Sequence, residues 1–332
     1  MKKIALMCAV LLLCTSCANA GGGDIIDEVS DIVSDMLPDG AEEYTLQLGV
    51  FQSHNASEGK AKFASTYACV ICDGDGKIVS CSFDATEDTL SVDGGIAETG
   101  GEYLSKRDRG NDYGMKAASG IGREWYEQAD HFAENIIGYT IDEVIDMENG
   151  DADLTSGCTI DTDPFKAALE ASDKDSMKKE FTAANEPAAS LAVVSNDEGS
   201  KNASDTNDGI AALSSTYAAV ALDGGRILAS MTEATETKVY FDASGLIIEI
   251  SKRPGKREQG ASYGMKPASD IGLEWYEQAD NFEEYTVGMN GDQVAAIGTN
   301  DGRPADDDLR SGCTVKVNEF IAAISKAANR QG

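Results

Sequence analysis

The chain has 332 residues, a formal net charge of −31 and a sequence pI near 4.2. This length suffices for two ordinary domains. So negative a charge argues against nucleic acid as a partner, because its phosphates would be repelled, and against attachment to anionic lipid by charge.

The first residues indicate export. Residues 1–3 carry positive charge, and residues 4–13 form an apolar run too short to span a bilayer. Small residues precede Cys17, which resembles a bacterial lipobox, in which the cysteine is lipidated and becomes the new N-terminus. The alternative is ordinary signal cleavage after residues 18–20, which also have a small-x-small pattern. We expect residues 1–16 to be a lipoprotein signal peptide and Cys17 to anchor the protein to the outer face of the cell membrane.

A long internal repeat organises the rest of the chain. Residues 113–132 recur at 263–282, with 16 of 20 positions identical and an offset of 150. A period this long, present twice, indicates two duplicated domains, because the units of a solenoid are far shorter. We place the domains at 44–175 and 188–330, with a polar linker at 176–187. The stretch before them, residues 17–43, is expected to be a spacer with an acidic amphipathic helix.

Each repeat begins with predicted strands and ends with predicted helices. In the first repeat, residues 44–51 resemble a strand, and residues 66–83 resemble two strands joined by an Asp-Gly turn. A helix is predicted from about Gly122, with Trp125 on its apolar stripe, and another from a capping box at 140–143. Strands before helices indicate an α+β fold of two tandem domains, each a mainly antiparallel sheet packed with helices.

Three cysteines near these strands could suggest a redox or zinc site. Cys69 and Cys72 form a CxxC pattern, but residues i and i+3 of a strand point to opposite faces. The second repeat has Ala219 and Leu222 at these positions and a serine in place of Cys81. We therefore expect the cysteines to fill the core, with a surface disulfide as the alternative.

The most informative pattern is a short string near the end of each repeat. It is DLTSGCT at 153–159 and DLRSGCT at 308–314. Its glycine permits a tight loop whose backbone N–H groups can converge on an anion, with the threonine hydroxyl as an attachment point. No base or metal that would activate this hydroxyl is evident nearby, which indicates a threonine modified by another protein. The alternative is a capped loop without a chemical role.

The string resembles the flavinylation motif Asp-x-x-Ser/Thr-Gly-Ala-Thr/Ser of FMN-binding domains. In that family a flavin transferase takes FMN from FAD and joins its phosphate to the threonine. The resemblance implies two covalent FMN groups, held as phosphoesters at Thr159 and Thr314. The other motif positions that it implies are Asp153, Ser156 and Gly157 in the first copy, and Asp308, Ser311 and Gly312 in the second. The chain departs from the motif at Cys158 and Cys313, where alanine is usual.

The whole layout is similar to that of the two-flavin lipoproteins of Gram-positive extracellular electron transfer. Those proteins have a lipobox, a spacer and tandem domains with a YGMK…EW.EQA block before the motif, and the resemblance covers residues 44–330. It implies cofactor contacts from this block, namely Tyr113, Met115 and Lys116, and Tyr263, Met265 and Lys266. Lys106 and Arg107 also recur, as Lys256 and Arg257. They would suit an FMN phosphate, or they are a solvated pair beside a loop.

The resemblance implies an electron carrier tethered outside the cell. It would pass electrons from a membrane quinone-linked NADH dehydrogenase system to extracellular acceptors such as ferric iron, free flavins or surface reductases. Such a protein is a redox carrier rather than an enzyme with its own substrate. Two alternatives stay open: a non-redox ligand-binding or adhesion lipoprotein, and an extracellular flavin-dependent reductase.

Other candidate residues carry less weight. The chain has two histidines, His54 and His131, and the repeat has Asn281 in place of His131, so we expect neither a histidine-based triad nor a zinc hydrolase. Trp125 and Trp275 lie on apolar helical stripes, so we expect both in the core. The alternative is that one of them stacks on a flavin ring.

Overall fold

The computed structural model describes residues 40–57 and 59–330. The expected signal peptide, Cys17 and nearly all of the spacer at 17–43 lie outside these residues, as does the side chain of Asp153. From Glu43 onward the chain forms one compact unit, and the fold below is that of this unit.

In the first half of the chain, strands come first and short helices follow. The elements are β1 (Glu42–Gln52), β2 (Asn55–Ser57), β3 (Lys60–Asp73), β4 (Ile78–Ser91), η1 (Asp93–Gly95), α3 (Lys106–Arg109), η2 (Gly110–Tyr113), α4 (Trp125–Asn135), α5 (Ile141–Asp146), α6 (Ala152–Thr155), α7 (Asp163–Ser172), η3 (Asp175–Met177) and β5 (Lys178–Ala183).

The second half also begins with strands and ends with helices. Its elements are β6 (Ala188–Asn196), β7 (Gly209–Asp223), β8 (Arg226–Phe241), β9 (Ile247–Lys252), α8 (Lys256–Gln259), η4 (Gly260–Tyr263), η5 (Lys266–Ala268), α9 (Trp275–Thr286), α10 (Gly291–Ala295), β10 (Thr299–Asn300), β11 (Arg303–Pro304), α11 (Asp307–Gly312) and α12 (Asn318–Asn329). It has in addition a short hairpin, β10–β11, between α10 and α11.

The strands form two main sheets. In the described part of the chain, one has five strands, with β1 between β3 and β5 and with β2 and β4 also paired to β3; the other has the order β6-β7-β8-β9. β3 pairs antiparallel with β1, β2 and β4, and the strands of the second sheet pair antiparallel throughout. Antiparallel sheets combined with helices confirm the α+β fold class.

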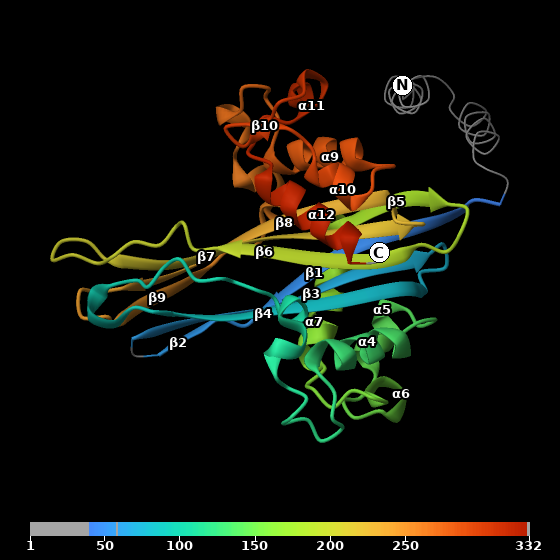
Figure 1. The fold of residues 1–332 in the computed structure, drawn as a ribbon, viewed down its shortest axis with the longest axis horizontal. Helices are drawn as coiled ribbons and strands as arrows, with labels where there is room; N and C mark the ends of the chain where they lie inside the picture. Colours follow the sequence, from blue (N-terminus) through green and yellow to red (C-terminus); the bar gives the residue numbers. More distant parts are fainter. Residues whose placement is uncertain (1–39, 58, 331–332) are drawn as a thin grey trace. The chain divides into compact units, whose positions relative to one another are not determined.

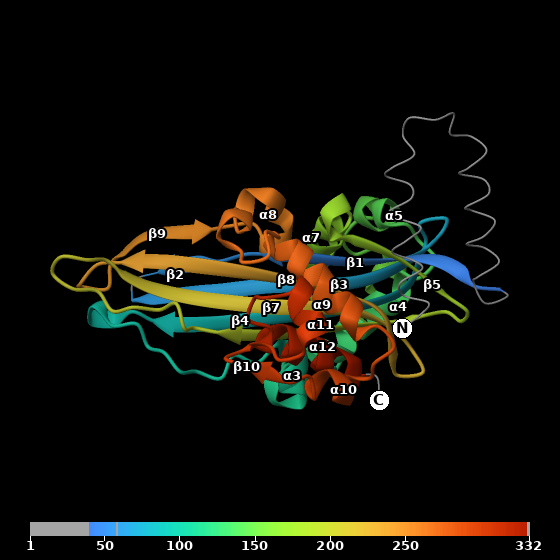
Figure 2. The same ribbon diagram turned by 90° about the horizontal axis from the view of Figure 1, so that it is seen from above.

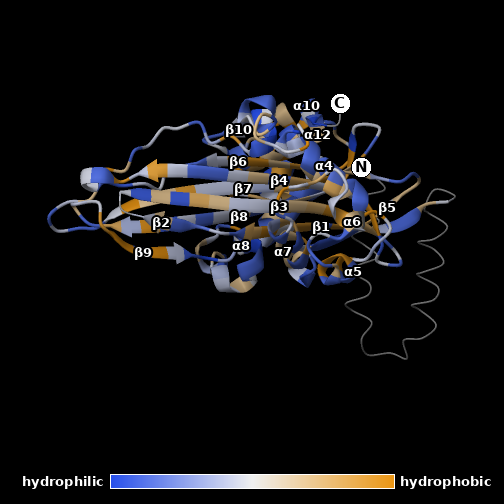
Figure 3. Ribbon diagram, turned by 90° about the horizontal axis from the view of Figure 1, so that it is seen from below, coloured by the Kyte–Doolittle hydropathy of each residue, from blue (hydrophilic) through white to orange (hydrophobic). Residues whose placement is uncertain are grey.

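The central strands are buried on both faces. On β3, Tyr67, Cys69 and Ile71 face the core between the two sheets, whereas Val70 and Cys72 face the helices. This alternation follows from the two-residue period of a strand, and burial on both sides explains the nearly continuous apolar sequence. Stretches of apolar residues run along the strands of both sheets (Figure 3).

The unit has four layers. The helices α4 to α7 cover the outer face of the first sheet, and α9 to α12 cover the outer face of the second, on the opposite side (Figure 1). The strands of the two sheets lie along a common direction (Figure 2), as in aligned sheet packing. Between the sheets, the rings of Tyr67 and Tyr217 lie 4.7 Å apart, centroid to centroid. The two candidate attachment sites therefore lie on opposite outer layers.

The expected linker at 176–187 takes part in the fold. It contains β5, which lies beside β1 in the first sheet, and Phe181 stacks on Tyr44 with ring centroids 5.8 Å apart. Lys179 on the same strand pairs with Glu283 of α9 at 3.0 Å. The segment therefore ties the first sheet to the helices of the second half.

The long helix of each half begins later than its apolar stripe predicts. Gly122 has a φ of +66°, which a right-handed helix cannot continue, and α4 begins at Trp125 after Glu124 as N-cap. Ile121, which precedes Gly122, is 41% exposed. The predicted helix start at Gly122 is therefore wrong, while the predicted core position of Trp125, 4% exposed, is confirmed, as is that of Trp275 at 3%.

Cys69 and Cys72 are core residues, as expected, and Cys81 packs half-buried against the same core as Cys72. Cys69 and Cys72 lie on opposite faces of β3, Cys81 lies on β4, and all three are free thiols. Burial raises the pKa of Cys69 and of Cys72 to about 12. These thiols are therefore protonated at neutral pH, and their opposite facing rules out a CxxC ligand pair.

Candidate functional site

The first copy of the string forms a turn that presents its threonine. α6 ends at Thr155, and the Cys158 N–H donates to the Thr155 carbonyl at 2.9 Å, while the Cys158 side chain is buried. Gly157 has a φ of +74°, and a Cβ there would lie 2.4 Å from Arg123 Nη1. Only glycine fits this position. Thr159, the next residue after the buried Cys158, is exposed.

Gln128 of α4 holds this threonine. The backbone N–H and the hydroxyl of Thr159 both donate to Gln128 Oε1, at 2.8 and 3.0 Å. Gln128 Nε2 in turn donates to Ser119 Oγ and the Arg123 carbonyl at 3.2 Å each, and to Met115 Sδ at 3.5 Å. One fully buried amide thus joins the helix, the YGMK loop and the SGCT turn.

The second copy repeats the glutamine bonds, although Gly312 ends α11 without a positive φ and Thr314 is half-buried. The N–H and the hydroxyl of Thr314 donate to Gln278 Oε1 at 2.8 and 3.1 Å. Gln278 Nε2 donates to Ser269 Oγ and the Leu273 carbonyl at 3.2 Å each, and to Met265 Sδ at 3.6 Å. We call these two arrangements the amide clasps, each consisting of the glutamine, its threonine and the three acceptors of Nε2.

Neither turn offers all its backbone donors to an anion. The N–H groups of Cys158 and Thr159 donate to the Thr155 carbonyl and to Gln128, and that of Cys313 donates to the Leu309 carbonyl. The expected convergence of loop N–H groups on an anion therefore does not apply to these positions. What the turns leave accessible is the threonine side chain.

The neighbouring acids of the motif lie on short helices. Asp153 lies on α6, and Asp308 lies exposed in the first turn of α11. An acid in the first turn of a helix stabilises its N-terminus. Ser156 and Ser311 are both exposed, and the hydroxyl of Ser311 donates to the Asp308 carbonyl at 2.7 Å.

The YGMK loop is fixed by a second buried side chain. The N–H groups of Met115 and Lys116 donate to the carboxylate of Glu124 at 2.9 and 3.1 Å. In the second half, the N–H of Met265 donates to Glu274 at 2.8 Å. This arrangement leaves the methionine half-buried against the core and the lysine exposed.

Lys116 and its counterpart Lys266 are free cations. Both are exposed, and neither ammonium has an ion-pair partner among the residues that the structure describes. Unpaired lysines are notable in a chain with 58 acidic and 27 basic residues. They are the basic groups of the repeated block that remain available to a phosphate.

The other repeated basic pair is structural in the first half. Lys106 Nζ lies 5.0 Å from the Tyr113 ring centroid and 5.6 Å from that of Trp125. Arg107 donates to the Phe83 carbonyl and pairs with Asp130 at 2.7 Å. The arginine is therefore neither a free phosphate ligand nor a solvated residue, so both interpretations from the sequence are wrong for it.

The same holds more strongly in the second half. Arg257 donates to the Thr232 carbonyl at 3.0 Å and pairs with Asp280 at 2.6 Å and Glu283 at 2.7 Å. Burial acts to lower the pKa of Arg257, but the carboxylates of Glu283 and Asp280 outweigh it and raise the pKa. Lys256 lies over the rings of Tyr263 and Trp275, as Lys106 does over theirs.

A pocket of about 470 Å³ opens beside the second site. It is lined by Lys256, Gln259 and Tyr263, together with residues of β7, β8 and α12. Its volume lies within the range of small-molecule pockets. Tyr263 belongs to the YGMK block, so this pocket adjoins the loop that the second amide clasp holds.

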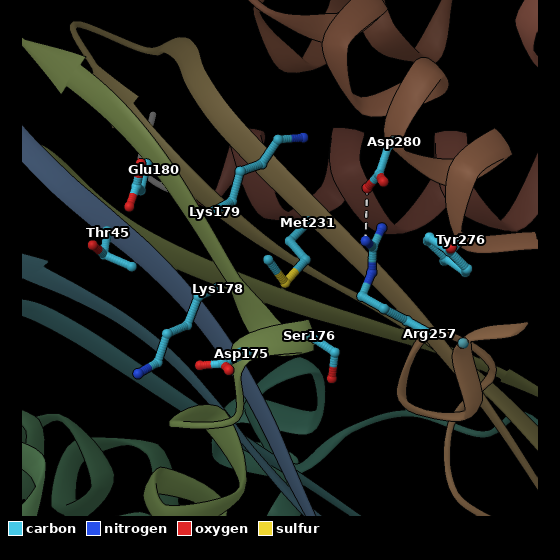
Figure 4. Close-up of a pocket in the computed structure, with 11 residues that line it drawn as sticks. Thr45, Asp175, Ser176, Lys178, Lys179, Glu180, Met231, Arg257, Tyr276 and Asp280 are labelled. Carbon is cyan, nitrogen blue, oxygen red and sulfur yellow. Dashed lines mark hydrogen bonds and ion pairs between the residues drawn. The ribbon is translucent and has the colours of Figure 1, made fainter. Parts of the chain in front are cut away.

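A larger pocket, of about 700 Å³, lies away from both clasps. Figure 4 shows its lining from β1, β5 and α9, with Lys178, Lys179, Arg257 and Asp280 around it. All three cations are already paired, Lys178 with Asp173 at 2.7 Å. Of the candidate residues from the sequence, only Arg257 lines this pocket, and its guanidinium is already paired with Asp280 and Glu283.

The residues that sequence reasoning missed are the clasp glutamines, the clasp serines and the acids that hold the YGMK loop. They are Gln128, Ser119 and Glu124 in the first half, and Gln278, Ser269 and Glu274 in the second. All lie at identical positions of the repeated block at 113–132 and 263–282. Sequence identity between the two halves is therefore the signal from which these residues could have been predicted.

Two kinds of feature, a membrane-spanning helix and a metal-binding cluster, are absent from the described residues. Among the helices of residues 40–57 and 59–330, none has the length and hydropathy of a membrane span, and the same residues contain no cluster of His, Cys, Asp and Glu suited to a metal ion. No family model, curated protein or solved structure matches this chain.

Proposed function

We propose that this protein is a membrane-tethered extracellular electron carrier that holds two covalent FMN groups, one on Thr159 and one on Thr314. The observation that supports the proposal most directly is the pair of amide clasps. Each holds a threonine hydroxyl by the same two hydrogen bonds, on the exposed Thr159 and on the half-buried Thr314. A flavin transferase would join the phosphate of FMN to these oxygens, with FAD as the donor.

The residues around each threonine fit a phosphoester. Thr159 is exposed, and the free ammonium groups of Lys116 and Lys266 lie in the loops that the clasps join to the threonine turns. They would offset the phosphate charge in an otherwise acidic protein. The pocket beside Tyr263 offers room for a planar group next to the YGMK block of the second half. FMN, when attached, supplies the ability to accept one or two electrons.

The role of the protein is then to hold the flavin, to set its surroundings and to prevent its loss outside the cell. The proposed donor is a membrane quinone-linked NADH dehydrogenase system. The proposed acceptors are ferric iron, free flavins or surface reductases. The two sites on opposite outer layers would give each flavin its own accessible face.

Mass measurement tests the attachment. Full-length protein coexpressed with a flavin transferase should gain the mass of two FMN less two waters, and its band should stay yellow and fluorescent after boiling in SDS. Thr159→Ala or Thr314→Ala should each remove one unit, and valine should act like alanine because the oxygen is the attachment atom. The double variant should be colourless and folded.

Two results would contradict the proposal. If the double variant keeps flavin that resists denaturation, the attachment lies on another residue. If the wild-type protein gains no flavin mass beside an active transferase, the protein is not a covalent flavin carrier, and a non-redox binding lipoprotein becomes the better description.

Membrane tethering is a separate part of the proposal. Cys17→Ala should release the protein from the membrane fraction or leave its precursor uncleaved. Unchanged retention of a normally processed protein would show that Cys17 is not the anchor.

A further inference from the structure

We infer that Gln128 and Gln278 are positioning residues that aim the acceptor hydroxyl for flavin transfer. The inference rests on the proposed attachment of FMN to Thr159 and Thr314. It assigns to each glutamine a role in the reaction that is distinct from holding the loop together.

The surroundings fix which way each amide points. Gln128 Nε2 faces the Arg123 carbonyl and Met115 Sδ, which are acceptors, and Oε1 faces the N–H of Thr159, which is a donor. A flipped amide would place acceptor against acceptor and donor against donor. The amide is 0% exposed, so water cannot satisfy the flipped state. Oε1 is therefore held toward the threonine.

A fixed Oε1 sets the threonine rotamer. The hydroxyl of Thr159 must donate its proton inward to Oε1, at 3.0 Å, beside the N–H of the same residue at 2.8 Å. The lone pairs of the hydroxyl oxygen then point away from the amide. Because Thr159 is exposed, these lone pairs are accessible to an incoming phosphorus atom. The clasp thus selects the rotamer that can react.

The chemistry assigns a positioning role and not that of a base. In the transfer, a bond forms between the threonine oxygen and the phosphorus of the FMN half of FAD. The bond from that phosphorus to the bridging oxygen breaks, and AMP leaves. The hydroxyl proton must go to a base, and an uncharged amide cannot accept it. As the oxygen–phosphorus bond forms, this hydrogen therefore turns from Oε1 toward a base on the exposed side of the threonine. The base therefore belongs to the transferase, and Gln128 sets only the direction of attack.

The two halves differ in the residue that supports the turn but share the glutamine–threonine bonds, and this supports the positioning role. The Gly157 carbonyl accepts from Arg123 at 3.2 Å, whereas the equivalent Gly312 carbonyl accepts from Asn281 at 3.0 Å. Support of the turn thus differs between the halves. The distances from glutamine to threonine agree within 0.1 Å.

Two substitutions distinguish an effect on the orientation of the Thr159 hydroxyl from an effect on the stability of the loop. Gln128→Met keeps the length of the side chain and removes both hydrogen bonds to Thr159. Gln128→Glu keeps an oxygen acceptor for the threonine and loses the Nε2 donors. Both should lower the melting temperature, but only the methionine should slow FMN attachment at residue 159. The expected loss is roughly five- to tenfold, because the attacking hydroxyl itself loses one of the two hydrogen bonds. Ser119→Ala, which removes one Nε2 acceptor without touching the threonine, is the matched control.

Each molecule carries its own reference site. The full-length variants are incubated with FAD, magnesium and a purified flavin transferase, and the occupancy of each threonine is followed by peptide mass. Loading of Thr314 should proceed at the wild-type rate in every Gln128 variant. The reciprocal Gln278→Met should slow Thr314 alone. The loss should fall mainly on kcat for the acceptor protein, with little change in KM.

Thr159→Ser supplies a second measurement. Serine lacks the branched methyl that restricts the rotamer of threonine, so its hydroxyl depends more on the glutamine. With Gln128 present, serine should load at nearly the threonine rate; with Gln128→Met, serine should load several-fold slower than threonine. Independent, multiplicative effects of the two substitutions would overturn the positioning role.

The outcomes separate this inference from the proposed function. If Thr159 in Gln128→Met loads as fast as Thr314 in the same molecules, the positioning role is wrong while attachment stands. If neither wild-type threonine loads, the proposed function fails first. If Gln128→Met does not fold, Gln128→Glu combined with Thr159→Ser decides, because the retained acceptor predicts loading within about twofold of Thr159→Ser alone, well short of the loss expected for one hydrogen bond.

Discussion

His54 shows how one buried residue can couple the two halves to pH. Its Nδ1 accepts the N–H of Ala64 at 3.2 Å, so the neutral ring carries its proton on Nε2, which donates to Thr237 Oγ1 of β8 at 2.8 Å. Burial, with a smaller contribution from Lys252, lowers the pKa of His54 to about 4. Protonation would place a donor on Nδ1 against the N–H of Ala64.

We therefore predict acid destabilisation through His54. A base with a depressed folded-state pKa contributes stability above its unfolded pKa, and this contribution is lost as pH falls through the folded value. Between pH 6.5 and 4 the wild type should lose up to about 3 kcal/mol that His54→Gln does not lose. Denaturant unfolding across this range measures the difference. His131→Asn, which introduces the residue of the second half, is the control and should follow the wild type.

Cys72 has a partner that its counterpart lacks. Gln47 Nε2 donates to Cys72 Sγ at 3.7 Å, and Gln47 is 5% exposed. The register places Gln47 beside Val70 and Ser190 beside Val220, so the second half has a serine where the first has Gln47. Leu222 therefore needs no polar partner.

This difference predicts a coupled pair. Cys72→Leu alone leaves a buried amide donor without an acceptor and should cost about 1–3 kcal/mol of unfolding free energy. Adding Gln47→Ser, which completes the pair of the second half, should recover most of that loss. Cys69→Ala and Cys81→Ser should be nearly neutral for folding. A double-mutant cycle in urea checks the coupling, and purely additive costs would contradict it.

At the scale of the elements, local patterns predicted the most. The capping box at Thr140 begins α5 as expected, and one at Asn290 begins α10, because a cap is a contact within one turn. The start of α4 was misplaced, because the positive φ of Gly122 depends on the loop that precedes the helix. β5 was missed because its sequence is polar, and it becomes a strand through pairing with β1.

The same distinction applies to the candidate site. The SGCT strings were evident because each is a contiguous motif, and the exposure of Thr159 is consistent with it. Gln128 was missed because its contacts join three segments that the sequence keeps apart. Arg107 was misassigned because its role depends on the Phe83 carbonyl of a distant strand and on Asp130. The roles of residues that act through tertiary contacts could not be predicted from sequence patterns.

At the scale of the whole molecule, ion pairs between the halves differ in burial. Arg330, after α12, pairs with Asp84 of β4 at 2.9 Å and with Asp108 of α3, and the Asp84 side chain is 0% exposed. A second pair between the halves, Lys174 with Glu258 at 2.6 Å, has side chains 50% and 33% exposed. Only the first pair leaves a buried charge behind when it is broken.

We predict that these two pairs contribute very differently to stability. Arg330→Gln should cost about 3 kcal/mol, because Asp84 remains buried without its partner. Lys174→Gln should cost less than about 1 kcal/mol, because water screens the exposed pair. Because the halves share the core between the sheets, Arg330→Gln should unfold in one transition at a lower denaturant concentration. Two separated transitions would show that the halves unfold independently.

The placement of the two threonines makes a last prediction about the proposed carrier. They lie in helical layers on opposite sides of two packed sheets. A sheet spacing of about 10 Å and a helix diameter of about 10 Å separate them by roughly 20 Å or more. The two clasps are built on different helices, α4 and α9, so loading of one should not alter the other. Thr159→Ala should leave the attachment rate at Thr314 unchanged, and the reverse should hold. The doubly loaded wild type should then be reduced by a soluble electron donor at the sum of the rates of the two singly loaded variants. A wild-type rate well above that sum would show communication between the sites through the sheets.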